Sequence, residues 1–195
     1  MRTGVYCGSF NPVHKGHIKI VRTALRRNLL DRVLIVPTGN YWDKQNLPPV
    51  KDRINMLKFF ENDRIMIDET HNDIQYTYQL FRALKQEYPD DQLVLIIGRD
   101  NIPTFDRWRE YRELLQYDFI IIPREDIDSE DLHAMMQQFG KTNYVIMEVN
   151  NISFSSSMIR ENIDDYQKIK SYIDKRVYNY MRKNMLNVVH PQSWT

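Results

Sequence analysis

Four short runs of apolar residues constrain the fold more than any other feature of this sequence. Each run is continuous rather than alternating, is rich in β-branched residues and ends near a turn-forming residue. They are VLIVP at 33–37, LVLIIG at 93–98, FIIIP at 119–123 and YVIMEV at 144–149. Such runs are typical of strands buried on both faces of a parallel sheet. TGVYCG at the start of the chain and RIMID at 64–68 predict two further strands.

Segments with helical spacing separate these runs. They lie at His17–Arg27, Lys51–Phe60, Tyr76–Tyr88 and Asp131–Phe139. The alternation predicts a doubly wound, Rossmann-like α/β fold, with helices on both faces of a parallel sheet. A chain of 195 residues suffices for one well-buried core. We therefore expect a single domain at 1–185, which includes a last amphipathic helix near 166–184, and a C-terminal tail at 186–195.

Glycine, asparagine and a proline pair interrupt both periodicities in TGNYWDKQNLPPV, at 38–50, which predicts a long loop. In open α/β sheets ligands bind beyond the carboxyl ends of the strands, so this loop should share one rim of the molecule with the loop after the first strand. The tail at 186–195 is expected to be frayed or to pack within an oligomer of identical subunits.

Charge and cysteine content narrow the partners and the compartment. The 27 basic and 26 acidic side chains nearly cancel, to a formal charge of +1, so no overall field would attract nucleic acid or an anionic membrane. We expect neither partner, and any anion site must be local. The single cysteine, Cys7, excludes an intramolecular disulfide and fits a reducing compartment, which indicates the cytoplasm. No run of about 18 apolar residues predicts a membrane span.

The stretch GSFNPVHKGH, at 8–17, follows the first predicted strand and opens the first predicted helix. Because a helix N-terminus presents unpaired N–H groups and the positive end of its dipole, it favours anions. His14 and His17, three positions apart, fall on one face of that first turn and could donate to the same anion. Gly16 costs the helix roughly 1 kcal/mol relative to alanine, which a flat ligand against the backbone would explain.

Two other interpretations of the histidine pair follow from the residues alone. The side chains could cap the helix or fill a polar margin of the core. They could instead bind zinc, but zinc needs further ligands, and the other candidates lack supporting spacing; these candidates are Cys7, His71, His133 and His190. The stretch matches neither the dinucleotide fingerprint G-x-G-x-x-G nor a Walker A loop.

The complete ten-residue string resembles the H-x-G-H signature of the nucleotidyltransferase superfamily. It has the form G-[ST]-F-[DN]-P-x-H-x-G-H of the nicotinate and nicotinamide mononucleotide adenylyltransferases. Later landmarks of that family follow in order: Lys44 in the loop after the second strand, a helix opening with Arg53 and Met56, Gly98-Arg99-Asp100 followed by Trp108, and Ser155-Ser156-Ser157-Met158-Ile159-Arg160. The stretch TYQLF at 77–81 is a looser match. The resemblance spans roughly residues 4–160.

The resemblance implies a role for each matched position. Phosphate contacts that act in catalysis would come from His14, His17, Lys44 and Arg160. ATP would be bound by Gly8, Ser9, Phe10, Gly16, Gly98, Asp100, Ser155, Ser156 and Ser157. The pyridine nucleotide would be bound by Tyr76, Thr77 and Trp108, with Trp108 stacked on the pyridine ring. Two positions depart from the family pattern: Ser157 replaces threonine, and Arg99 stands where many members have alanine.

The implied reaction is adenylyl transfer from ATP to nicotinate mononucleotide, which yields nicotinate adenine dinucleotide and pyrophosphate in NAD biosynthesis. Mg²⁺ would accompany ATP, held mainly by phosphate oxygens rather than by protein ligands. Alternatives are a nicotinamide-preferring or dual-specific enzyme, another superfamily member such as a pantetheine-phosphate adenylyltransferase or a cytidylyltransferase, and a non-catalytic nucleotide sensor. Trp108 and the Gly98–Asp100 spacing favour a pyridine nucleotide.

Overall fold

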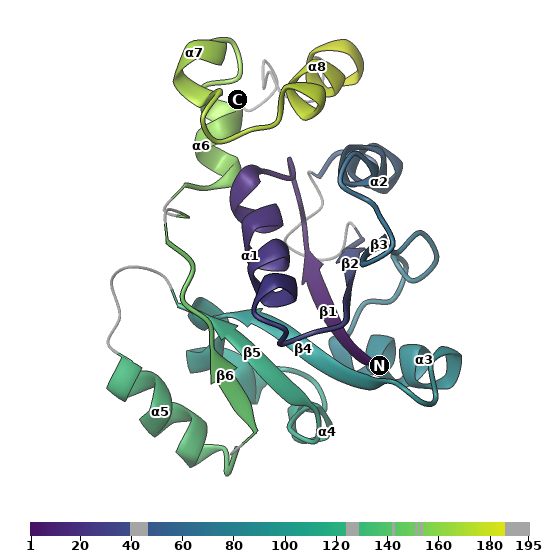
Figure 1. The fold of residues 1–195 in the computed structure, drawn as a ribbon, viewed down its shortest axis with the longest axis vertical. Helices are drawn as coiled ribbons and strands as arrows, with labels where there is room; N and C mark the ends of the chain where they lie inside the picture. Colours follow the sequence, from purple (N-terminus) through teal and green to yellow (C-terminus); the bar gives the residue numbers. More distant parts are fainter. Residues whose placement is uncertain (40–46, 124–128, 142, 151, 153, 186–195) are drawn as a thin grey trace.

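A computed structural model describes residues 1–39, 47–123, 129–141, 143–150, 152 and 154–185 (Figure 1). Its centre is a six-stranded, entirely parallel sheet with the order β3-β2-β1-β4-β5-β6. The strands are β1 (Arg2–Gly8), β2 (Arg32–Pro37), β3 (Ile65–Ile67), β4 (Gln92–Gly98), β5 (Asp118–Ile122) and β6 (Tyr144–Ile146). All six predicted strands are confirmed, and the fold is the doubly wound α/β fold expected from the sequence.

The last strand is shorter than the apolar run at 144–149 predicts. Ile146 pairs with Ile121, and the N–H of Met147 still donates to the carbonyl of Ile121. Strand β5 then ends at Ile122, ahead of Pro123, which has no N–H to continue a ladder. Because β6 lies at the edge of the sheet and pairs only with β5, it ends where its partner ends.

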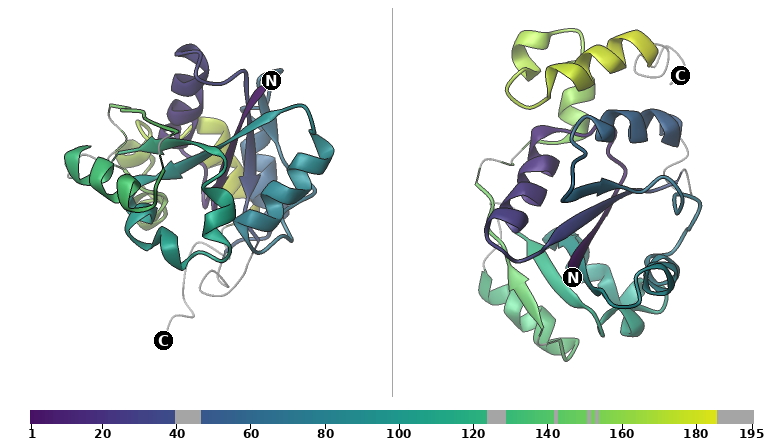
Figure 2. Two further views of the ribbon diagram at one scale, coloured as in Figure 1. Left: turned by 90° about the horizontal axis from the view of Figure 1, so that it is seen from below. Right: turned by 45° about the vertical axis from the view of Figure 1, so that its right-hand side comes forward.

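Helices cover both faces of the sheet (Figure 2). One face carries α1 (Lys15–Arg26) and α2 (Val50–Lys58), together with α6 (Ser156–Glu161), α7 (Tyr166–Ile169) and α8 (Lys175–Asn184). The other carries α3 (Thr77–Glu87), the 3₁₀ helix η2 (Arg99–Arg107), α4 (Tyr111–Leu114) and α5 (Ser129–Gln138).

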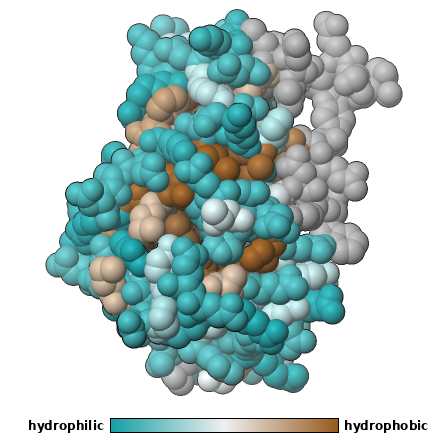
Figure 3. All heavy atoms as spheres, turned by 90° about the vertical axis from the view of Figure 1, so that its right-hand side faces the viewer, coloured by the Kyte–Doolittle hydropathy of each residue, from teal (hydrophilic) through white to brown (hydrophobic). Residues whose placement is uncertain are grey.

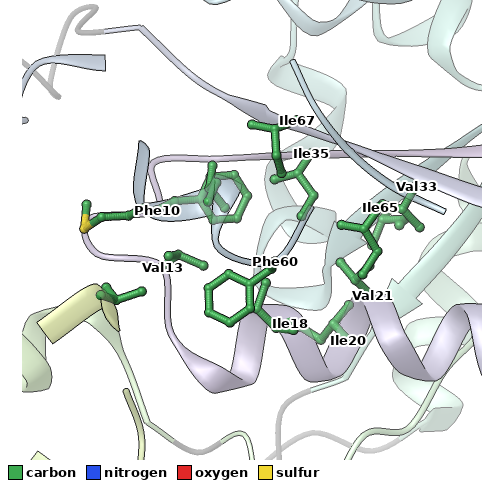
Figure 4. Packing of buried hydrophobic residues seen from close by; sticks show 14 of the residues in the cluster. Phe10, Val13, Ile18, Ile20, Val21, Val33, Ile35, Phe60, Ile65 and Ile67 are labelled. Atoms are coloured by element: carbon green, nitrogen blue, oxygen red, sulfur yellow. The ribbon is translucent and has the colours of Figure 1, made fainter. Parts of the chain in front are cut away.

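The strands supply alternate side chains to the two cores. In β2, Val33 and Ile35 belong to the core under α1, whereas Leu34 and Val36 belong to the core under α3. Figure 4 shows the first of these cores, in which Phe10 lies with the strand residues Ile35 and Ile67. A strand that buries both alternating sets reads as an unbroken apolar run, which explains why the runs predicted the strands.

The predicted single helix at 166–184 is wrong, because two helices occupy that stretch. Helix α7 ends at Ile169, and Ile169 and Ile173 are both buried in the core. Asp174 then starts α8 by accepting the N–H of Arg176 at 2.8 Å. An aspartate at an N-cap favours a new helix start over continuation of the old one. The sequence also did not predict the short elements η2 and α4, and the tail at 186–195 lies outside the described residues.

The fold brings β1 and β4, distant in sequence, together at the centre of the sheet. The chain winds outward from this pair in both directions, so their carboxyl ends mark the topological switch point, where ligands bind in folds of this class. Helices α6, α7 and α8 lie beside the N-terminal end of α1 (Figure 1). On the face in Figure 3, hydrophobic residues form a band across the middle, surrounded by hydrophilic residues. None of the helices in the described ranges is long and apolar enough to cross a membrane.

Candidate active site at the carboxyl ends of β1 and β4

The turn between β1 and α1 is a tightly held loop rather than an open one. Phe10 has φ of 47°, a left-handed conformation that non-glycine residues seldom adopt, and its ring is 2% exposed. The buried Arg53 of α2 donates to the carbonyl of Ser9 at 2.8 Å and to that of Pro48 at 3.2 Å. Burial lowers the pKa of Arg53 to about 10. Such strain persists where surrounding contacts hold it, and it is frequent at functional sites.

The ring of Phe10 belongs to the core, which changes how its predicted nucleotide contact must be understood. The side chain packs edge-on against Tyr6, with centroids 5.5 Å apart, and is part of the cluster shown in Figure 4. Only the backbone of this residue is left to face a nucleotide. Gly8 and Ser9 lie beside it on the same loop, and the carbonyl of Gly8 accepts the N–H of Thr38 at 2.9 Å.

His14 and His17 cap α1 reciprocally. The Nδ1 of His14 accepts the backbone N–H of His17 at 3.3 Å, and the Nδ1 of His17 accepts the backbone N–H of His14 at 3.2 Å. Their rings stack with centroids 3.6 Å apart. Because each Nδ1 is an acceptor, the neutral form of each ring carries its proton on Nε2. The helix-capping interpretation is therefore confirmed, and the same contacts orient both rings as Nε2–H donors.

Gly16 makes room for this pair. A Cβ atom there would lie 3.0 Å from Nδ1 of His14 and 3.3 Å from the ring of Phe154. Phe154 packs edge-on against His14, with centroids 5.1 Å apart, and contacts Tyr172 on its other side. The packing of these rings accounts for the glycine without the flat ligand that the sequence suggested.

The segment before and within α6 approaches the same loop from a distant part of the chain. Ser156 donates its hydroxyl to the carbonyl of Pro12 at 2.9 Å. Arg160 donates to the carbonyl of Asn11 and to the hydroxyl of Ser157, and burial lowers its pKa from the ordinary value. Ser155 caps α6 by accepting the N–H of Met158. The structure thus brings together the loop at 8–14, both histidines, the three serines and Arg160.

A pocket of about 420 Å³ opens between the carboxyl ends of β1 and β4. It is lined by Tyr6, Cys7, Gly8, Thr38, Gly39, Gln75, Tyr76, Thr77, Leu95, Ile96, Ile97, Gly98, Asn101, Arg107, Trp108 and Arg109. All three residues predicted to bind the pyridine nucleotide, Tyr76, Thr77 and Trp108, are among them. Trp108 is half-buried and its ring packs against that of Phe105, with centroids 5.2 Å apart. This contact holds the Trp108 ring in place.

Residues at and after the end of β4 line one side of this pocket. A Cβ atom at Gly98 would lie 2.5 Å from Oδ1 of the exposed Asp100, so a side chain there would displace that carboxylate. Asn101 donates to the carbonyl of Gly98 at 3.3 Å. Arg99 points away from solvent: it is 3% exposed, and its Nη1 has no hydrogen-bond partner in the described part of the chain.

Lys44 lies outside the described residues, so its position relative to the site is not described. Within the described ranges, no three side chains of His, Cys, Asp or Glu are grouped in a way that could hold a metal ion. The zinc interpretation of His14 and His17 therefore finds no third ligand there. With Nδ1 accepting in both rings, each neutral imidazole offers an Nε2–H donor, which suits the oxygens of an anion.

Sequence reasoning missed several pocket residues. Tyr6 lines the pocket, and its ring is 6.3 Å from that of His17, so it joins the pocket to the histidine pair. Arg107 and Arg109 flank Trp108 and line the pocket with it. The sequence did offer a signal for these two arginines, because both are adjacent to a tryptophan that was itself predicted to bind a ligand. Tyr6 gave none, because alternate residues of a buried strand look alike in sequence.

Comparisons with known proteins agree with this geometry. The model of the family described as cytidylyltransferase-like matches residues 5–162. A Fusobacterium nucleatum protein named probable nicotinate-nucleotide adenylyltransferase is 30% identical, over 96% of this chain and 100% of that protein. A protein of the same name from Clostridium acetobutylicum is 25% identical, over 96% of this chain and 99% of its own length.

Solved structures show the same fold. The Plasmodium falciparum nicotinic acid mononucleotide adenylyltransferase complexed with NaAD superposes with a TM-score of 0.80 at 24% identity, covering 97% of this chain and 98% of that one. A putative nicotinate-nucleotide adenylyltransferase from Vibrio parahaemolyticus superposes with a TM-score of 0.66 at 17% identity, covering 94% and 93% of the two chains. The similarity therefore extends over nearly the full length of each chain.

Proposed function

The chain belongs to the cytidylyltransferase-like family of nucleotidyltransferases, and on that basis we propose that it is a nicotinate-nucleotide adenylyltransferase. It would transfer the adenylyl group of ATP to nicotinate mononucleotide, forming nicotinate adenine dinucleotide and pyrophosphate, in the biosynthesis of NAD. Relatives that carry this name match 96% of the chain. A cytoplasmic location is part of the proposal and rests on the single cysteine, Cys7.

One observation carries the proposal: two subsites of different chemistry meet at the end of β1. On one side lie the two histidine rings, whose Nδ1 atoms accept backbone N–H groups so that Nε2 carries the proton, and Arg160, which donates to the carbonyl of Asn11 on the same loop. The pocket that contains Trp108 offers an aromatic surface on the other side, and Gly8 and Tyr6 lie between them. The arrangement suits two ligands that react with each other, the triphosphate at the donors and the pyridine nucleotide against the tryptophan.

The proposed reaction needs little from the protein besides positioning. The phosphate of the mononucleotide attacks the α-phosphorus of ATP, the bond from that phosphorus to the bridging oxygen breaks, and pyrophosphate leaves with the electron pair. A phosphate monoester has a second pKa near 6, so the nucleophile is already largely dianionic at neutral pH and needs no general base. Catalysis then depends on aligning two anions that repel each other and on stabilising the charge that develops on the phosphates.

Hydrogen-bond donors near the N-terminus of α1 would align the phosphates and stabilise their charge. In the proposal, Nε2–H of His17 contacts the α-phosphate and that of His14 the adjacent phosphates. Arg160 contributes a full positive charge from α6, and Lys44 a second one from its loop. Gly8, Ser9, Phe10, Gly98, Asp100 and Ser155–Ser157 would contact the remainder of ATP. Mg²⁺ would be held by phosphate oxygens, where it supplies further charge neutralisation.

Pyrophosphate release tests the proposal directly. The purified chain is incubated with ATP and Mg²⁺ and with each of four acceptors: nicotinate mononucleotide, nicotinamide mononucleotide, phosphopantetheine and a simple phosphoalcohol. We expect release only with the pyridine mononucleotides. A second series replaces ATP with CTP. Release from CTP or with phosphopantetheine would assign the chain to another activity of the superfamily, and no release under any condition would indicate a non-catalytic nucleotide sensor.

We expect nicotinate mononucleotide to be preferred over the nicotinamide form. A carboxylate accepts charge-assisted hydrogen bonds, which are roughly twice as strong as neutral ones. The amide would instead present two N–H groups to the side of the pocket that holds Arg107 and Arg109, whose side chains only donate. Unpaired N–H groups there would cost about 1–3 kcal/mol, or roughly 5- to 150-fold in specificity. The kcat/KM values of the two mononucleotides, measured side by side, decide this point. A ratio near one would leave a dual-specific adenylyltransferase.

Trp108→Ala should raise the KM for the mononucleotide about tenfold or more, with a much smaller change in the KM for ATP, because aromatic stacking contributes roughly 0.5–1.5 kcal/mol beyond the buried area. Tyr111→Ala is the matched control, since Tyr111 also packs on Phe105 but does not line the pocket. Steady-state kinetics with each substrate varied in turn give both constants. Equal effects of the two substitutions would limit Trp108 to a packing role.

A further inference from the structure

The charge of the pocket at β1 and β4 is one-sided. Arg107 and Arg109 are among its lining residues, and no aspartate or glutamate in the described ranges lines it. The remaining lining groups are apolar, aromatic or uncharged polar side chains and glycines. An anionic group on a flat ring would thus meet positive charge without a competing carboxylate in the wall. The two cations precede and follow Trp108 directly in the chain, and all three residues line the same pocket.

Arg109 has the more defined surroundings of the two. Its guanidinium carbon lies 5.1 Å from the centroid of the Tyr76 ring. The Tyr76 side chain makes the largest contribution to raising the pKa of Arg109, and a guanidinium is charged at any physiological pH. Tyr76 precedes α3 and also lines the pocket. The guanidinium is thereby held against the pocket wall, although the residue as a whole is exposed.

Arg82 is a useful comparison with Arg109, because the charge of Arg82 is neutralised within the protein. Arg82 lies 5.0 Å from the ring centroid of Tyr78, much as Arg109 lies over Tyr76. Arg82, however, donates to both carboxylate oxygens of Glu113, at 2.8 and 2.7 Å. Among the residues that the structure describes, Arg109 forms no such ion pair, and the adjacent Glu110 acts on it only through its charge, as a smaller contribution to its raised pKa. Its charge is available to a ligand, whereas that of Arg82 is satisfied within the protein.

The start of α3 adds donors at the same place. Tyr76 gives the helix no side-chain cap, and the first turn contains no acidic residue. The first N–H groups of an α-helix have no partner within the helix and carry partial positive charge. Tyr76 and Thr77 both line the pocket, so these groups and the Arg109 guanidinium converge on one edge of it.

We propose that Arg109 is the specificity-determining residue that selects a pyridine ring bearing a carboxylate over one bearing a carboxamide. This inference rests on the proposed function. The planar guanidinium matches a carboxylate with two parallel N–H donors, which an amide cannot reproduce, since one of its two positions is itself a donor. With the ring stacked on Trp108, the carboxylate lies toward Tyr76, between Arg109 and the start of α3.

The central experiment compares wild type with Arg109→Gln on both mononucleotides at saturating ATP. Glutamine retains hydrogen-bonding capacity and removes the charge. We expect kcat/KM for nicotinate mononucleotide to fall roughly 10- to 100-fold, mostly through KM, because the lost contact is formed in the bound ground state as well as in the transition state. The value for nicotinamide mononucleotide should stay within threefold. The ratio of the two values is the quantity that tests the inference.

Three further variants complete the design. Arg112→Gln is the matched control, since Arg112 is also exposed and lies 5.3 Å from the centroid of a tyrosine ring, that of Tyr111, but does not line the pocket; its ratio should equal that of wild type. Arg109→Lys keeps the charge without the paired geometry and should give an intermediate ratio. Arg107→Gln tests the second pocket cation, and the ratio should change less than with Arg109→Gln.

Several outcomes would overturn the inference. Equal losses on both mononucleotides in Arg109→Gln would indicate a general role in shaping the pocket, and an unchanged ratio would exclude a role in selection. A larger change in Arg107→Gln would transfer the role to Arg107. The wild-type measurements separately test the proposed function, because an enzyme that uses neither mononucleotide refutes that function, whereas one that uses them without a change in ratio refutes only the role of Arg109.

Discussion

Replacing His17 by alanine should lower the turnover number by roughly 10²–10³-fold and leave the affinity for ATP within several-fold of wild type. A donor aimed at a developing charge acts mainly in the transition state, and removal of one such donor has an effect of this size. Single-turnover rates at saturating substrates give the first quantity, and equilibrium titration with ATP in the absence of the acceptor gives the second. An equal loss in both would assign His17 to ground-state binding instead.

The capping role of His17 requires its own control. The Nδ1 of this ring accepts the backbone N–H of His14, so alanine removes a structural contact together with the proposed Nε2–H donor. His17→Asn places an amide oxygen near the position of Nδ1 and has no counterpart of Nε2. We expect the asparagine variant to recover the melting temperature but not the turnover. Recovery of both would show that the cap, and not the Nε2–H donor, is what activity requires.

His14→Ala should give a comparable loss of turnover together with a loss of stability. His14 is the N-cap of α1, and its Nδ1 accepts the N–H of His17 at 3.3 Å. Removal of a side-chain acceptor at an N-cap costs about 1 kcal/mol, which for a chain of this size corresponds to a fall in melting temperature of about 2–4 °C. The substitution also removes the ring that stacks on His17 and packs against Phe154.

His14→Ser separates the two effects, because serine is a favoured N-cap residue and lacks the ring. We expect the serine variant to melt at a higher temperature than the alanine variant, because it restores the cap but not the ring contacts, and to remain as slow as the alanine variant. Thermal unfolding by circular dichroism and turnover measured on the same preparations provide the comparison. A serine variant with wild-type turnover would reduce His14 to a capping residue and remove it from the proposed phosphate site.

These variants differ in kind from substitutions elsewhere in the loop. Phe10 is buried in the core and Arg53 holds the carbonyl of Ser9, so changes at either position would alter the loop and the histidines together. The histidine rings can instead be replaced while their backbone contacts are preserved. For this reason they offer the clearest separation between architecture and catalysis in this site.

The prediction of secondary structure was correct where burial alone determines the pattern of apolar residues. A strand buried on both faces must be apolar at every position, so the runs at 33–37 and 93–98 identified β2 and β4 without knowledge of their neighbours. Prediction was less successful where a tertiary contact decides. The end of β6 depends on where β5 stops, and the division of 166–184 into α7 and α8 depends on the cap at Asp174 and on the burial of Ile173.

The site shows the same division. Local sequence was sufficient to identify the ten-residue string at 8–17, because its strand end, its helix start and its two histidines are contiguous. The roles within it were not visible, since the core position of Phe10 and the contact of Gly16 with Phe154 come from segments far apart in the chain. The sequence likewise gave no role for Arg109, because its contact with Tyr76 joins two segments that are distant in the chain.

What the sequence by itself determined is the alternation of buried strands and helices and the short motifs that each occupy one turn, because both depend on interactions between residues close in the chain. What only the tertiary structure decided is which motifs meet. The parallel pairing of β1 with β4 brings Gly8 and Gly98 to the same pocket, and the packing of α6 against the loop at 11–12 brings Arg160 to Asn11, on the loop that leads to the histidines. Those contacts join residues separated by about 90 and about 150 positions, and they form only when the two cores on either side of the sheet are buried together.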